Sequence, residues 1–152
     1  MRLERLEMSP LEIVFRTSFK HASADRAKTA SVWVEAHAGD AGFVGHGEGC
    51  PREYVTGESV ASAIEWFNFH RAGIMADIAD LGTLKKWVED HAAVIDHDPA
   101  AWCAVELAVL DLLGQEAGQP VEALLTTPEL APAYQYSAVL GDGPAEAFRE
   151  AT

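Results

Sequence analysis

The spacing of apolar residues changes once along the chain, near residue 58. Before this point apolar and polar residues alternate, as they do on half-buried strands. The predicted strands are marked by Leu11, Ile13 and Phe15, by Val32, Val34 and Ala36, and by residues 43–48 after a turn at 39–42. Three strands in hairpin order predict an antiparallel sheet within about residues 2–49.

After residue 58 the apolar residues recur every three to four positions, which indicates amphipathic helices. The predicted helices are marked by Val60, Ile64 and Phe67, by Leu84, Trp87, Val88 and His91, by residues 99–117, and by a short segment at 120–125. Strands followed by helices predict an α+β fold. We therefore expect a three-stranded antiparallel meander followed by a helical bundle.

The helix at 99–117 has the strongest pattern in the chain. Asp98 is a suitable cap, Pro99 suits the first turn, and Gly118 is a typical end. One apolar stripe holds Trp102, Val105, Val109 and Leu112, and a second holds Cys103, Leu107 and Leu110. Two stripes predict a helix that is buried nearly all round.

The last twenty residues differ from the rest. An apolar run at 134–140, a turn at 141–144 and a helical start at 145–151 form one βα unit. A single βα unit cannot close a barrel of eight. We therefore divide the chain into a domain at 1–130 and the start of a second domain at 131–152.

Charge and composition exclude several classes of function. The formal net charge is −13, from 11 Lys and Arg against 24 Asp and Glu, and phosphate binding needs a basic surface. Nucleic-acid binding is therefore not expected. No apolar run is long enough for a membrane span, and residues 1–20 lack the apolar core of a secretory signal. Cys50 and Cys103 form no metal or disulfide pattern, so the predicted compartment is the reducing cytoplasm.

The two loops that flank the predicted sheet are the best candidates for a binding site. The first, residues 15–26, carries Phe19, Lys20 and His21, and the second, residues 50–58, carries Arg52 and Tyr54. One loop follows the first strand and the other follows the third, so both leave the same end of the sheet. Cationic and aromatic side chains there could close over a small carboxylate substrate. The alternatives are that the cations are merely solvated and that the aromatic rings pack the loops onto the sheet.

Three other patterns have simpler structural explanations. The glycines at 42, 45, 47 and 49 lack the following Lys-Ser of a phosphate loop, and close backbone approach explains them better. His91 and His97 lie among acidic residues, but their spacing of six favours a solvated turn over a metal site. Nothing in the sequence places a hydrolytic triad.

An ordered set of motifs resembles the capping domain of the enolase superfamily, in the mandelate-racemase and muconate-lactonizing branch. The motifs are FRTSFKHASADR at 15–26, Gly45-His46-Gly47-Glu48, PREYVTGE at 51–58, AVELAVLDLLG at 104–114, and GQPVEALL at 118–125. Thr126 and Thr127 stand where the family usually has two glycines. The resemblance covers about residues 2–140.

The resemblance implies a capping domain that closes a modified TIM barrel. In such enzymes the barrel supplies the carboxylates that bind Mg²⁺ and the bases that remove a proton alpha to a carboxylate. The capping loops cover the distal end of the substrate, which gives Phe19, Lys20, His21, Arg52 and Tyr54 a substrate-binding role. The parent would be a racemase, cycloisomerase or dehydratase.

The sequence itself contains none of the catalytic groups of that barrel. We expect the 152-residue chain to be inactive by itself, to bind no Mg²⁺, and to need the missing barrel as a partner. Its exposed apolar surfaces also predict a homo-oligomer. The alternative is a non-catalytic binding or interaction module that reuses the fold.

Overall fold

A computed structural model describes residues 2–21, 24–39, 42–126 and 135 of this chain. The strands precede the helices, as the change of hydrophobic period predicts, but the described residues form five strands and five helices where the sequence predicted three and four. The strands are β1 (Leu3–Leu11), β2 (Val14–His21), β3 (Ala24–Lys28), β4 (Ser31–Ala38) and β5 (Val44–Gly49). The helices are α1 (Val60–Asp77), α2 (Leu81–Asp90), α3 (Ala92–His97), α4 (Pro99–Ala117) and α5 (Val121–Leu125).

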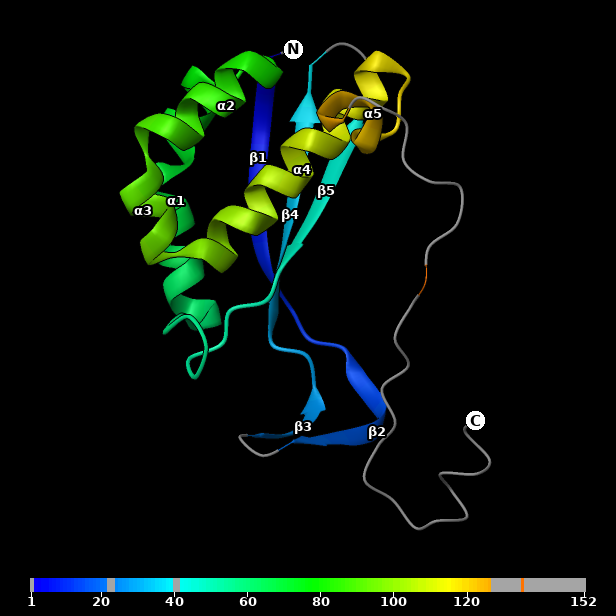
Figure 1. Ribbon diagram of the computed structural model, residues 1–152, viewed down its shortest axis with the longest axis vertical. Helices are drawn as coiled ribbons and strands as arrows, with labels where there is room; N and C mark the ends of the chain where they lie inside the picture. The colour runs from blue at the N-terminus through cyan, green and yellow to red at the C-terminus, as the bar shows by residue number, and fades with distance from the viewer. Residues whose placement is uncertain (1, 22–23, 40–41, 127–134, 136–152) are drawn as a thin grey trace.

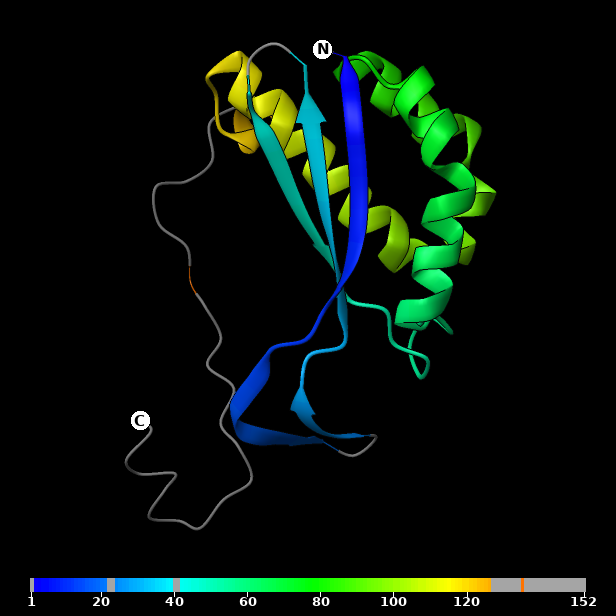
Figure 2. The ribbon, with the colours of Figure 1, turned by 180° about the vertical axis from the view of Figure 1, so that it is seen from behind.

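The main sheet has three antiparallel strands in the order β1-β4-β5. Its register places Glu7 opposite Glu35, and Glu35 opposite His46. The predicted α+β architecture is therefore confirmed. Helix α4 crosses one face of the sheet (Figure 1), and no described helix crosses the opposite face (Figure 2).

The first predicted strand was misplaced by several residues. The strand of the main sheet is β1, whose core side chains are Leu3 and Leu6, exposed by 4% and 1%. Ile13 is 53% exposed, so the alternation around it does not lie on the core sheet. The predicted loop at 15–26 is in fact a β-hairpin, because β2 and β3 pair in a separate two-stranded sheet.

The core lies between the main sheet and the helices. Val32, Val34 and Ala36 on β4 are fully buried against it. On the helical side, the rings of Trp87 and Trp102 stack with centroids 4.4 Å apart. This stack joins α2 to α4, so the helical bundle is built around aromatic side chains.

Helix α4 ends as predicted but is not buried all round. Gly118 ends the helix in the left-handed conformation, with φ of 62°. Of the second apolar stripe only Leu110 is buried; Cys103 is exposed and Leu107 is 44% exposed. The helix covers the sheet with one side and presents a partly apolar side to solvent, because no described element lies over it.

The βα unit predicted for residues 134–151 lies almost wholly outside the described residues. The same holds for the domain boundary at 130–131, which remains a prediction.

None of the described helices is both long enough and apolar enough to cross a bilayer.

Candidate functional site

Both candidate loops lie at the same end of the main sheet, as the strand order requires. Strand β1 leads into the β2–β3 hairpin, and β5 leads into loop 50–58 (Figure 1). This part of the sequence prediction is confirmed. Two segments separated by some thirty residues in the sequence are thus placed side by side by the antiparallel pairing of β1, β4 and β5.

The β2–β3 hairpin joins the main sheet through residues 12–13 and 29–30, which we call the neck. Hydrogen bonds of Thr29 hold the neck together. The Thr29 backbone N–H donates to the carbonyl of Ile13 at 2.8 Å, and the Ile13 N–H donates to Thr29 Oγ1 at 2.9 Å. The same hydroxyl donates to the carbonyl of Leu11 at 3.2 Å. Lys28, at the end of the hairpin, forms an ion pair with Glu12 at 2.7 Å, and both side chains are more than half exposed.

The three candidate residues of the first loop lie on one strand of the hairpin. Phe19, Lys20 and His21 are in β2, opposite Arg26, Asp25 and Ala24 respectively. Their side chains lie outside the described part of the structure. Backbone pairing places them at the outer end of the hairpin, in the separate two-stranded sheet, and their substrate-binding role stays a prediction.

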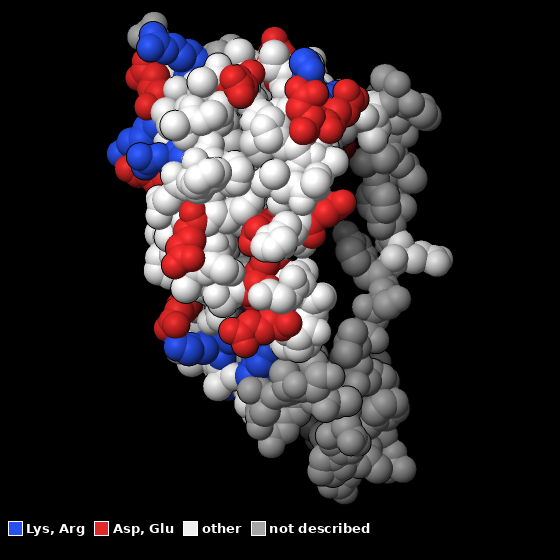
Figure 3. Space-filling model, turned by 90° about the vertical axis from the view of Figure 1, so that its left-hand side faces the viewer, with Lys and Arg blue, Asp and Glu red and all other residues white. Residues whose placement is uncertain are grey.

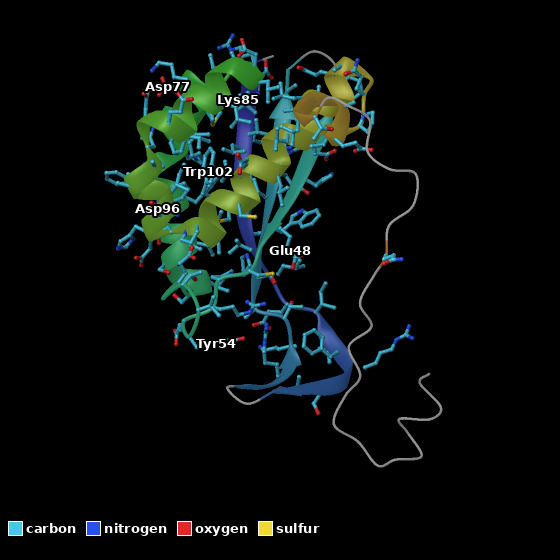
Figure 4. The ribbon with its side chains drawn as sticks, in the orientation of Figure 1. Glu48, Tyr54, Asp77, Lys85, Asp96 and Trp102 are labelled. Atoms are coloured by element: carbon cyan, nitrogen blue, oxygen red, sulfur yellow. The ribbon has the colours of Figure 1, made fainter. Side chains whose placement is uncertain are left out.

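Loop 50–58 is a compact turn with an exposed apolar tip. The N–H groups of Val55 and Thr56 both donate to the carbonyl of Arg52, at 2.9 and 2.8 Å. Gly57 follows with φ of 79°, a conformation that favours glycine. Tyr54 and Val55 are 52% and 69% exposed, and Figure 4 shows Tyr54 on the loop beside the hairpin. Tyr54 is therefore only about half covered, and its substrate-binding role stays a prediction.

Arg52 is engaged in a structural contact between the two loops. Its Nη1 donates to the carbonyl of Ala30 and to that of Pro51, both at 2.6 Å. Ala30 lies between β3 and β4, so the guanidinium ties loop 50–58 to the neck of the hairpin. The structure thus gives Arg52 a contact that sequence reasoning missed; its substrate-binding role stays a prediction.

Glu58 anchors the far end of the same loop, and sequence reasoning missed it. Its carboxylate is 2% exposed and accepts the N–H groups of Ala100 and Ala101, each at 3.0 Å. Asp98 was predicted to cap α4, but its side chain makes no capping bond and instead accepts from His97 Nδ1 at 2.6 Å. The signal for Glu58 was its place at the end of the PREYVTGE motif.

The glycines of β5 allow α4 to lie directly on the strand. A Cβ atom at Gly45, Gly47 or Gly49 would clash with a carbonyl oxygen of α4, namely that of Ala108, Ala104 or Ala100 respectively. The prediction of close backbone approach is confirmed for these three glycines. It does not hold for Gly42, which has φ of 68° and no atom within 4 Å of an added Cβ. Asp111 accepts the outward N–H of His46 at 2.8 Å, and Gln115 donates to the carbonyl of Val44 at 2.8 Å. Helix α4 therefore also protects the exposed edge of β5.

The described residues contain one group of metal-ligating atoms that converge, on the open face of the sheet. Atoms of Glu7, Glu35 and His37 lie within 4.8 Å of one another. The guanidinium of Arg5 lies 3.0 Å from His37 Nε2 and 3.6 Å from Glu7, so a cation already occupies the group. Mg²⁺ prefers an octahedron of oxygen ligands, and this mixed group does not fit it.

His91 and His97 do not converge on a common point. The ring of His91 stacks on Trp87 with centroids 4.0 Å apart, and His91 Nδ1 donates to the Trp87 carbonyl at 2.9 Å. The segment between the two histidines was predicted as a turn but forms helix α3. The hydrogen bond to Asp98 raises the pKa of His97.

The charged surface agrees with the overall acidity. On the side of the molecule formed by α1, α2 and α3, acidic side chains are scattered over the surface and Lys and Arg lie at its margins (Figure 3). This face has no basic stripe of the kind that tracks a phosphate backbone.

Comparisons with known proteins give related results for sequence and fold. No protein-family model matches the chain. It is 28% identical over 127 residues to a hydrophobic dipeptide epimerase of Enterococcus faecalis, which covers 82% of this chain and 34% of that protein. It is 26% identical over 129 residues to an N-succinyl-L-Arg/Lys racemase of Bacillus cereus, covering 82% and 33%.

Solved structures of such enzymes share the fold. The L-Ala-D/L-Glu epimerase from Bacillus subtilis matches with a TM-score of 0.72 and 26% identity, over 82% of this chain and 34% of that one. A dipeptide epimerase from Enterococcus faecalis, complexed with Mg and L-Leu-L-Tyr, matches with a TM-score of 0.65 and 28% identity, over 84% and 35%. The chain therefore spans about a third of the length of its relatives.

Proposed function

We propose that this chain, whose sequence relatives and structural neighbours are those of the enolase superfamily, acts as the substrate-capping domain of a Mg²⁺-dependent epimerase or racemase. A cycloisomerase or dehydratase acting by proton abstraction alpha to a carboxylate is the wider class. The catalytic groups and the metal then belong to a barrel domain, for which residues 131–152 provide the start and residues 1–130 the cap.

The observation that carries this proposal is the placement of two loops at one end of the main sheet. The hairpin and loop 50–58 emerge side by side, and loop 50–58 is anchored to the neck by Arg52 and to α4 by Glu58. Its tip presents Tyr54 and Val55 to solvent. An exposed apolar tip on a fixed base is suited to covering the distal part of a small bound molecule and to excluding water from it.

The chain's own residues would then bind and orient the substrate without breaking its bonds. Phe19 and Tyr54 would contact apolar groups, whereas Lys20, His21 and the free donors of Arg52 would attract a carboxylate. The relatives named above are a hydrophobic dipeptide epimerase and an N-succinyl-L-Arg/Lys racemase, so we propose a small carboxylate of that kind. The exposed free cysteines, Cys50 and Cys103, agree with a reducing cytoplasm.

A chimera tests the proposal. Residues 1–125 of this chain are fused to the part of the Bacillus subtilis epimerase that follows its matching segment. The expected result is Mg²⁺-dependent exchange of a dipeptide α-proton in D₂O, followed by proton NMR. The same barrel portion without a cap is the control and should show far less exchange.

A folded chimera that exchanges no α-proton in dipeptides or N-succinyl amino acids would contradict the proposal. That outcome would favour the non-catalytic interaction module. Tyr54→Ala in an active chimera should change the relative rates among dipeptides with different distal side chains, since Tyr54 lies on the capping loop rather than near the reacting carbon.

A further inference from the structure

The hydrogen bonds at the neck connect the two capping loops to one another. On the hairpin side, Thr29 binds Leu11 and Ile13. The next residue, Ala30, accepts from Arg52 at 2.6 Å. Loop 50–58 and the hairpin are thus joined through two consecutive residues, although they follow different strands of the main sheet.

A second contact lies beside the first. Ser31, the first residue of β4, is fully buried, and its Oγ lies 3.5 Å from Cys50 Sγ. Residues 29–31 therefore contact the end of β1, the start of the hairpin and the start of loop 50–58. The end of β1 and the end of β5 meet at this point because both strands flank β4 in the sheet.

The hydrogen bond from Arg52 to Ala30 is stronger than the contact between Ser31 and Cys50, because Arg52 is charged. Hydrogen bonds from a guanidinium are shorter and stronger than those between neutral groups, and its planar shape fixes the direction of the donors. Arg52 also accepts the N–H groups of Val55 and Thr56 through its carbonyl, so its backbone holds the turn while its side chain holds the neck.

We propose that Arg52 is a positioning residue that couples loop 50–58 to the β2–β3 hairpin, so that the two capping loops move as one unit. Exposed apolar residues lie on both sides of this junction, with Val14 at 76% and Val55 at 69% exposure. A ligand that orders one loop would thereby favour the ordered state of the other. This use by a ligand rests on the proposed capping function, whereas the coupling itself is a property of the free chain.

Amide hydrogen exchange of the full 152-residue chain measures the coupling directly. Arg52→Ala should accelerate exchange roughly tenfold at the amides of loop 50–58 and also at the paired amides of β2 and β3, since local opening loses hydrogen bonds at the neck. Arg52→Lys keeps a cationic donor group but loses the planar guanidinium, and should fall between Arg52→Ala and the wild type. Arg71→Ala, on the exposed side of α1, is the matched control and should change neither loop.

A variant on the hairpin side of the neck tests whether the effect of a substitution is confined to the loop that carries it. Thr29→Val is nearly isosteric and removes only the hydroxyl at the hairpin side of the neck. It should accelerate exchange in loop 50–58, to which Thr29 forms no hydrogen bond among the described residues. Acceleration confined to the mutated loop in both variants would overturn the proposal, as would unchanged exchange in both. Neither result depends on whether the chimera described above is active.

Discussion

Removing the charge of Glu58 should destabilise the whole domain, even though Glu58 lies in a loop. Its carboxylate is 2% exposed and accepts two backbone N–H groups at the start of α4, those of Ala100 and Ala101. The first N–H groups of a helix have no partner within the helix, and the helix dipole favours a negative charge there. Glu58 therefore supplies the cap that Asp98 does not.

The magnitude follows from the number and type of bonds. A hydrogen bond to a charged group contributes about 1.5–3 kcal/mol, and a capping side chain typically about 1 kcal/mol. Glu58→Gln keeps the shape but loses the charge and turns an amide NH₂ toward a donor, so we expect a loss of about 2 kcal/mol. Glu58→Ala leaves both N–H groups without an acceptor, and we expect a loss of about 3–4 kcal/mol.

Urea unfolding followed by circular dichroism measures these changes. The matched control is Glu53→Gln, the same substitution at an exposed position of the same loop, which should stay within about 0.5 kcal/mol of the wild type. Two results would refute the reasoning. In one, Glu58→Gln is as stable as the wild type; in the other, the two Gln variants are destabilised equally, which would show that charge in the loop matters and the cap does not.

Four further predictions concern packing, protonation, metal binding and association. Gly47→Ala should lower the free energy of unfolding by roughly 1–3 kcal/mol, as at an overpacked core site, because its Cβ would meet the carbonyl of Ala104. Gly73→Ala in α1 is the control: its Cβ meets nothing within 4 Å, and the variant should gain about 1 kcal/mol of stability. Urea unfolding measures both changes. Burial raises the pKa of Glu106, so the folded protein loses stability as the pH rises from the ordinary Glu pKa of 4.5 through the raised pKa in the folded state. Glu106→Gln should remove this loss when the free energy of unfolding is measured against pH. An unchanged pH profile would contradict this prediction. Calorimetry should find Mg²⁺ bound no more tightly than by a generic acidic surface, and a stoichiometric micromolar site would contradict this. The full chain should self-associate in sedimentation experiments, and deletion of the residues after Pro132 should reduce this; a monomer at high concentration with the tail intact would show the opposite.

The sequence determined the features that depend on neighbouring residues. Pro99 and Gly118 delimit α4 because the φ preference of proline and the left-handed conformation of glycine are local properties. The change from alternation to helical spacing near residue 58 separated strands from helices for the same reason. Strand order alone also placed the two loops at one end of the sheet, since antiparallel strands must alternate in direction.

Only the tertiary structure decided which polar groups satisfy one another. Asp98 has the right residue type and position for a cap, yet Glu58, forty residues earlier, occupies the site because the packing of β5 on α4 brings the loop to the helix start. Arg52 likewise had the chemistry of a ligand contact, and only the meeting of β1, β4 and β5 showed that it reaches Ala30. Residue type limits what a side chain can bind, but a hydrogen bond requires two groups to lie about 3 Å apart, and that distance is set by the packing of elements distant in sequence.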